Sequence, residues 1–86
     1  MEKDKKFKID KSKDISSDLF HYIQSNLYDE EIILSDKNDN TIVFKWKFEP
    51  QTAGTETQKL AYQTMKITEV VNFLLKKVDE KFGESK

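Results

Sequence analysis

Large apolar side chains and mostly charged side chains alternate strictly along residues 41–49. Successive side chains of a β-strand point to opposite faces, so this alternation predicts a strand with one buried face. The apolar face carries Ile42, Phe44, Trp46 and Phe48, and the opposite face carries Val43, Lys45, Lys47 and Glu49. A slip of one residue would exchange the two faces, so the pattern also specifies the pairing register. Pro50 predicts the end of the strand, because proline cannot donate a ladder hydrogen bond.

A second strand is predicted over residues 31–36, shortly before the first. The link between the two strands consists of Lys37, Asn38, Asp39 and Asn40. Such residues tolerate a left-handed backbone and are typical of hairpin turns. The sequence therefore predicts an antiparallel β-hairpin with strands 31–36 and 41–49.

A helix is predicted over residues 15–27, before the hairpin. Its apolar side chains recur at helical spacing and are Ile15, Leu19, Tyr22, Ile23 and Leu27. Asp14 stands at the expected N-cap position, and acidic side chains in the first turn favour a helix start. An acidic cluster then ends the helix, and it consists of Asp29, Glu30 and Glu31.

The segment after Pro50 has two interpretations. Apolar positions from Leu60 to Val78 follow one another at spacings of three and four, which favours one long helix over residues 55–82. Thr55 and Gln58 form a capping-box pair at its start. The alternative is a third strand over residues 59–67, because that stretch is rich in strand formers. Its alternation is poor, so the long helix is preferred.

The lysine-rich region 1–13 also has two interpretations. It is either a charged tail or, through Phe7 and Ile9, a short edge strand near residues 7–9. The predicted fold is therefore α+β, with a small antiparallel sheet packed against an N-terminal helix and a long C-terminal helix. A chain of 86 residues suffices for one domain only, predicted over residues 14–83. Gly83 is expected to stop the last helix, and 84–86 is expected to be a tail.

The composition disfavours catalytic chemistry. The absence of cysteine excludes disulfides, zinc–thiolate clusters and thiol catalysis. Two isolated glycines cannot build a phosphate-binding loop. His21 is the only histidine, and no nucleophile motif accompanies it, so we interpret it as a helix-surface residue. We expect no enzymatic activity, no cofactor and no metal site.

All basic side chains of the chain are lysines, because arginine is absent. Arginine supplies the bidentate contacts that read guanine and phosphate, so its absence disfavours sequence-specific DNA binding. A composition of this kind is typical of AT-rich genomes, such as those of low-GC bacteria and their phages. Weak nucleic-acid binding through Lys45 and Lys47 is the alternative function. The rings of the same strand lie on the opposite face, which favours a core role over base stacking.

A helix of the predicted length would extend beyond strands of about 20–30 Å. Its uncovered apolar side chains would then need a protein partner or a second copy of the chain. We therefore predict a non-enzymatic protein-binding module, such as a phage or mobile-element accessory or inhibitor protein of a low-GC bacterial host. The candidate contacts are Leu60, Phe73 and Phe82 together with Asp29, Glu30 and Glu31.

Neither a signal peptide nor a membrane span is visible in the sequence. The N-terminal region is charged rather than apolar, and the longest apolar runs, such as 32–34, are far shorter than the roughly 20 residues of a membrane span. A cytoplasmic location without a membrane partner is therefore expected.

Overall fold

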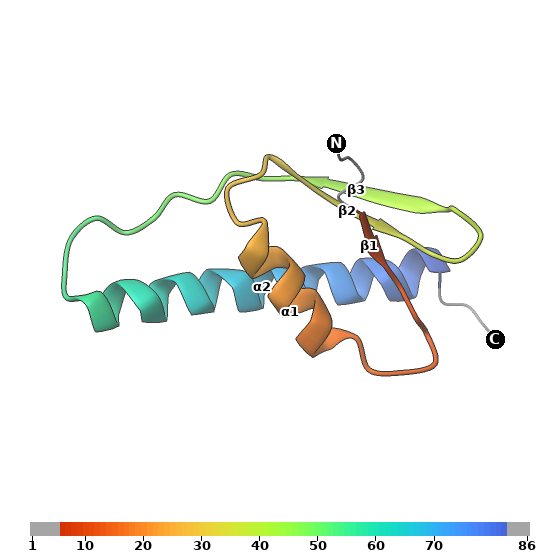
Figure 1. The fold of residues 1–86 in the computed structure, drawn as a ribbon, viewed down its shortest axis with the longest axis horizontal. Coiled ribbons are helices and arrows are strands. Elements are labelled where there is room, and N and C mark those ends of the chain that lie inside the picture. The colour runs from red at the N-terminus through yellow and green to blue at the C-terminus, as the bar shows by residue number, and fades with distance from the viewer. Residues whose placement is uncertain (1–5, 83–86) are drawn as a thin grey trace.

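The computed structural model describes residues 6–82, which form a three-stranded sheet with two helices on one of its faces (Figure 1). In chain order the elements are β1 (Lys6–Lys8), α1 (Ser16–Ser25), β2 (Glu31–Ser35), β3 (Thr41–Lys45) and α2 (Glu56–Phe82). The predicted α+β class, the hairpin, the N-terminal helix and the long C-terminal helix are confirmed.

The sheet has the strand order β1-β2-β3 and is mixed. β2 and β3 are antiparallel, with Glu31 opposite Lys45, whereas β1 and β2 are parallel, with Phe7 opposite Leu34. Parallel neighbours need a crossover connection, and α1 supplies it by returning the chain to the end at which β1 began. The prediction of an antiparallel sheet therefore holds for the hairpin and is wrong for the edge strand.

β1 decides between the two interpretations of the N-terminal region in favour of an edge strand at residues 6–8. Ile9 follows it into the core, and its N–H donates to the Ser35 carbonyl at 2.8 Å. Lysines flank the one inward-facing residue of the strand, Phe7, as the alternation predicted. The remainder of the predicted tail, 1–5, lies outside the described residues, and so do the predicted stop at Gly83 and the tail 84–86.

The core lies between the sheet and the two helices. α1 contributes Leu19 and Ile23, both fully buried, and the sheet contributes the fully buried Ile32 and Leu34. The other buried apolar side chains are Ile9, Ile15, Leu27, Phe48, Ile67, Val70, Val71, Leu74 and Val78. The two faces of β3 are as predicted, because its alternate side chains Ile42 and Phe44 are partly buried and the others are exposed.

α2 is one continuous helix, so the alternative of a third strand over residues 59–67 is wrong. The predicted capping box begins it, since the Gln58 N–H donates to Thr55 Oγ1 at 3.1 Å and the Thr55 N–H donates to Gln58 Oε1 at 2.9 Å. The helix-spaced apolar stripe, including the fully buried Ile67 and Leu74, outweighs the strand propensity of single residues. Neither helix of residues 6–82 combines the length and the apolar character needed to cross a membrane.

α1 is shorter than predicted at both ends. Asp14 acts at its start, because its Oδ1 accepts the Ser16 N–H at 2.9 Å, although Ile15 occupies the N-cap position itself. At its end the Asn26 side chain donates through Nδ2 to the Tyr22 carbonyl at 2.8 Å. Polar side chains thus bond backbone groups at both ends of α1.

β3 ends at Lys45, well before Pro50. Only one further ladder bond follows, from the Trp46 N–H to the Glu30 carbonyl at 3.1 Å. The alternation of exposure nevertheless continues to the buried Phe48, because the aromatic side chains follow the core after the hydrogen-bonded ladder has ended. The segment from residue 46 to residue 55 therefore leaves the sheet in an extended form.

Candidate protein-binding groove

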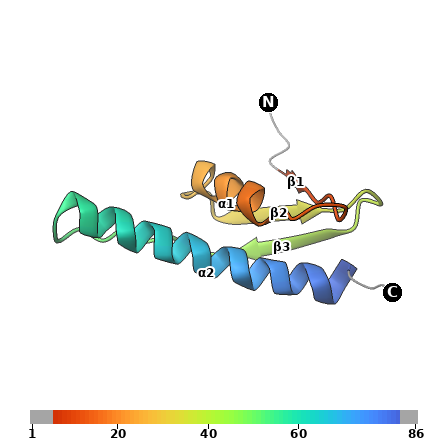
Figure 2. The ribbon, with the colours of Figure 1, turned by 90° about the horizontal axis from the view of Figure 1, so that it is seen from below.

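The N-terminal half of α2 extends beyond the end of the sheet, and the segment 46–55 runs beside it before the helix begins (Figures 1 and 2). Leu60 lies on the same helical stripe as the buried Ile67 and Leu74, which follow at intervals of seven residues. Leu60 is nevertheless 61% exposed. The stripe that is buried further along α2 is thus exposed to solvent at Leu60, in the part of the helix that extends beyond the sheet.

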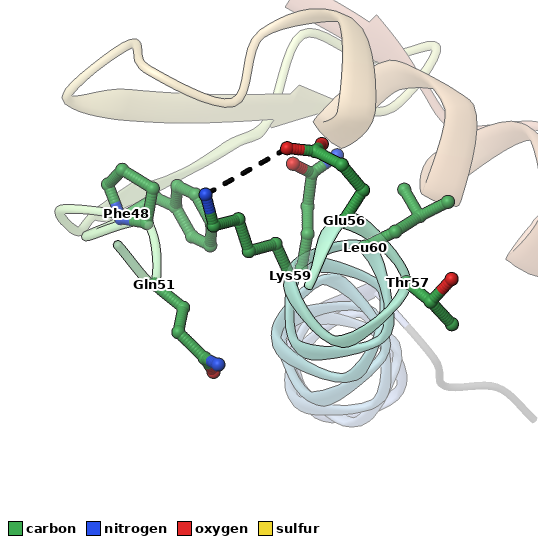
Figure 3. A pocket seen from close by; sticks show the side chains of 8 residues that line it. Phe48, Gln51, Glu56, Thr57, Lys59 and Leu60 are labelled. Atoms are coloured by element: carbon green, nitrogen blue, oxygen red, sulfur yellow. Dashed lines mark ion pairs between the residues drawn. The ribbon is translucent and has the colours of Figure 1, made fainter. Parts of the chain in front are cut away.

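A groove of about 370 Å³ lies between the segment 46–55 and the N-terminal half of α2. Figure 3 shows Phe48 and Gln51 on one side of it and Leu60 and Thr57 on the other. The residues that line this overhang groove are Phe48, Pro50, Gln51, Glu56, Thr57, Lys59, Leu60 and Gln63. Phe48, Pro50 and Leu60 form its apolar walls, and the other lining residues form a polar rim.

Other aromatic side chains hold Phe48 in place as the wall of the overhang groove. Its ring centroid lies 6.2 Å from Trp46, 6.3 Å from Tyr62 and 5.7 Å from Tyr28. Trp46 continues the cluster to Phe44 at 6.3 Å. Tilted and edge-on ring pairs at these distances are favourable, so the cluster anchors the extended segment to the sheet and to α2.

The polar rim contributes local order rather than large electrostatic energy. Lys59 Nζ lies 3.9 Å from the Glu56 carboxylate, and the pair is solvent-exposed enough to add little stability.

The turn that leads into α2 depends on a glycine. Gly54 has a φ of 105°, a backbone conformation in which residues with a side chain are strained. A Cβ at Gly54 would also come within 2.6 Å of Gln58 Oε1. The sharp turn into α2 therefore depends on glycine and fixes the mouth of the overhang groove.

The three apolar candidate contacts lie in different places. Leu60 lines the overhang groove, whereas Phe73 lies further along α2 with its ring 5.2 Å from Phe44. Phe73 is 44% exposed. Phe82 is half-buried against the core, and its carbonyl accepts Lys11 Nζ at 2.6 Å. Leu60 in the overhang and Phe73 beside β3 are therefore the two that remain exposed.

Two of the acidic candidates, Glu30 and Glu31, lie with the lysine candidates at the open end of the hairpin, away from its turn. Antiparallel pairing returns the end of β3 to the start of β2 and places Lys45 opposite Glu31. A shallow hollow there is lined by Glu30, Glu31, Lys45, Trp46 and Lys47. Opposite charges across neighbouring strands attract, so neither lysine stands in a uniformly positive surface.

The aromatic face of β3 is covered by α2, as the alternation predicted. Phe44 and Trp46 are partly buried against the core on that face, and Lys45 is exposed on the other. A base-stacking platform needs rings and lysines on nearly the same surface. The rings of β3 therefore serve the core.

Asp36 lies in the hydrogen-bonded hairpin turn, and His21 lies on the surface of α1. Asp36 Oδ1 accepts the N–H groups of Asn38 at 2.8 Å and Asn40 at 3.0 Å, and Oδ2 accepts the side-chain amide of Asn40 at 3.1 Å. Loss of solvent raises the pKa of Asp36, but these hydrogen bonds outweigh it and hold the pKa below its ordinary value. His21 is exposed on α1 and lies edge-on to Phe20. Within residues 6–82 no cluster of three or more His, Asp or Glu side chains is arranged to hold a metal ion.

The sequence predicts the side chains of the overhang groove but not that they meet. Leu60 follows from its place in the helical stripe, and Phe48 is a core residue as the alternation predicts, but nothing local places it beside Leu60. The return of the extended segment along α2 creates the second wall, and no local pattern signals that return. No protein-family model, no curated protein and no solved structure matches the chain.

Proposed function

We propose that this chain is a non-enzymatic protein-binding module that receives an apolar side chain of a partner in the overhang groove. The observation that carries the proposal is the exposure of Leu60, 61%, on a helical stripe whose later members are buried. Together with Phe48 and Pro50, Leu60 forms the apolar part of a groove with a polar rim, and contiguous apolar surface of this kind marks interaction sites.

The size and lining of the overhang groove support this function. A volume of about 370 Å³ is at the low end for small-molecule sites, and it suits one or two large side chains of a protein. Phe48 offers an aromatic wall, and Gln51 and Gln63 offer amide groups at the rim. Protein interfaces commonly combine a buried apolar anchor with a polar rim of this kind.

The composition supports a narrower proposal for the partner's origin. The exclusive use of lysine is typical of the genomes of low-GC bacteria and their phages, so we place the chain among phage or mobile-element accessory or inhibitor proteins. The partner is then a protein of the bacterial host. A cytoplasmic location is part of the same proposal.

The proposal is tested by affinity capture from a nuclease-treated lysate of a low-GC bacterium, at low and high salt. Leu60→Glu places a charge in the overhang groove and is expected to abolish capture of a defined host protein. Met65→Glu is the matched control, because Met65 is also exposed, at 48%, but lies on the face of α2 opposite the buried stripe. Circular dichroism checks that both variants remain helical.

The outcomes of this capture discriminate between the candidate functions. Loss of the host protein with Leu60→Glu but not with Met65→Glu supports the overhang groove. Recovery of the same proteins with all three chains would contradict it. Recovery of the chain alone would indicate a homodimer or larger self-assembly, which sedimentation at increasing concentration would verify.

Nucleic-acid binding is a second candidate, because the face of the sheet away from the helices carries lysines. Lys6, Lys8 and Lys45 are exposed there, and Lys47 follows in the same alternation. Binding through these side chains would weaken steeply with salt, since each phosphate contact releases counterions. A double substitution Lys45→Gln and Lys47→Gln would then reduce retention on single-stranded DNA, whereas Leu60→Glu would not.

A further inference from the structure

The outer edge of β3 has backbone groups without a partner among residues 6–82. β3 pairs with β2 on one side only. Ladder bonds at its two ends join Asp36 to Asn40 at 3.0 Å and Trp46 to Glu30 at 3.1 Å. In an antiparallel pair, such bonded positions alternate with positions whose N–H and C=O groups point away from the partner strand. The outward set consists of Thr41, Val43 and Lys45.

α2 provides an apolar floor beside this edge. Figure 2 shows α2 running alongside β3, and the 5.2 Å between the rings of Phe73 and Phe44 confirms that the two elements are neighbours. Phe73 lies on the flank of α2 that faces β3, because its ring is 5.2 Å from Phe44, and it remains 44% exposed. A fourth strand added to the edge of β3 would lie over Phe73 and bury it.

A second copy of this chain fits the edge poorly when its helices lie on the same face of the sheet. Antiparallel pairing of β3 with its own copy, about a twofold axis perpendicular to the sheet, would place two α2 helices under two strands that are about 4.8 Å apart. Packed helices need about 8–10 Å between their axes. The segment that pairs with β3 must therefore arrive without a helix of its own at that position.

The charges at the edge specify the chemistry of such a segment. Lys45 is exposed on the open face of the sheet, and Lys47 follows two positions later. Val43 lies before them on the same face and is 52% exposed. A neighbouring strand would approach Lys45 from the side opposite to Glu31, at a cross-strand Cβ separation of about 5 Å. Acidic side chains on the open face and apolar side chains over Phe73 complement this surface.

We propose that the outer edge of β3 binds an extended segment of a partner protein as a fourth strand, and that acidic and apolar residues alternate in that segment. This inference rests on the proposed protein-binding function and adds the mode of binding and the class of peptide. Main-chain hydrogen bonds from Thr41, Val43 and Lys45 supply affinity, and the alternate side chains supply specificity.

The probe for this inference is an acetylated and amidated eight-residue peptide of alternating valine and glutamate, titrated into the full chain and followed by NMR. Binding is expected to slow amide exchange at Thr41, Val43 and Lys45, whose N–H groups point away from the only strand that pairs with β3 among residues 6–82. A peptide of alternating valine and lysine is expected to bind at least about tenfold more weakly, because like charges then face each other across the strands.

Val43→Pro is the decisive variant. Proline is tolerated at an edge position whose N–H points outward, so the pairing of β3 with β2 remains intact. The variant loses the outward donor and is expected to bind the glutamate peptide at least about tenfold more weakly. Val43→Thr keeps the donor and the β-branched shape, and its affinity is expected to stay within about twofold.

The results that would contradict strand addition at β3 differ from those that would contradict partner binding in the overhang groove. Equal binding by Val43→Pro, no binding of the glutamate peptide at millimolar concentration, or equal binding of both peptides would overturn strand addition at this edge. The titration needs no natural partner, so it can fail while Leu60-dependent capture of a host protein succeeds. A captured protein that is lost with Val43→Pro as well as with Leu60→Glu would support both.

Discussion

At the scale of single residues, Leu60 and Leu74 show how place in the fold decides the role of a side chain. Both are leucines on one stripe of α2, two heptads apart. Leu74 is fully buried beneath the sheet, whereas Leu60 lies in the overhang and is mostly exposed. The same chemistry therefore contributes to stability at one position and is free to contribute to binding at the other.

Alanine substitution at the two leucines is expected to separate these roles. Leu74→Ala should lower the free energy of unfolding by about 2–5 kcal/mol, because it leaves a cavity in the core. Leu60→Ala should change it by no more than about 0.5 kcal/mol, as is usual for exposed positions. Urea denaturation of both variants measures the difference. Similar losses of stability in the two variants would contradict the assigned surroundings of Leu60.

At the scale of elements, α2 combines two parts with different support. Its second half packs on the sheet and α1 through Ile67, Leu74 and Val78. Its first half has the extended segment on one side and depends more on its own hydrogen bonds, including the capping box of Thr55 and Gln58. Such a weakly packed end is expected to open locally before the rest of the molecule unfolds.

Removal of the capping box should therefore act locally. Thr55→Ala removes the acceptor of the Gln58 N–H and should destabilise the first turns of α2 by about 1 kcal/mol. Amide hydrogen exchange should become faster over residues 56–63 and remain unchanged at residues 67–74. Equal acceleration in both regions would indicate that the helix opens as one unit. Thr55→Ser keeps the hydroxyl and serves as the control.

β3 shows how much one element was predictable. Its two faces follow from the alternation of side chains, because the period of a strand is two. Its end at Lys45 did not follow, since the apolar alternation continues to Phe48 after the ladder has stopped. The overhang groove depends on that early departure from the sheet, and half of its wall was therefore hidden from sequence reasoning.

At the scale of the whole molecule, hydrogen bonds lower the pKa values of three loop carboxyl groups. Hydrogen bonds from the Ser12 side chain and backbone lower the pKa of Asp10, and hydrogen bonds from Ser16 lower the pKa of Asp14. Hydrogen bonds from Asn38 and Asn40 in the hairpin turn likewise lower the pKa of Asp36. Asp10 and Asp14 lie in the connection between β1 and α1, and Asp36 lies in the hairpin turn, so these groups order two connections.

Stability is therefore expected to fall in acid. A carboxyl group whose folded pKa lies below its unfolded value of about 3.9 stabilises the fold above that value. The contribution is lost as the pH falls through the folded pKa, because the unfolded chain then binds more protons. Urea midpoints measured between pH 7 and pH 2 should decline below about pH 4. A triple variant with Asn at positions 10, 14 and 36 should decline less, and a parallel decline would contradict these assignments.

The sequence by itself determined the α+β class, the hairpin and its register, and the long helix with its capping box. These features depend on local periodicity and on side chains within a few positions of one another. Only the tertiary structure decided that β1 pairs in parallel, that Glu31 lies opposite Lys45, and that Phe48 meets α2 across an open groove. These features depend on which segments return to lie side by side, and burial of the shared core decides that return.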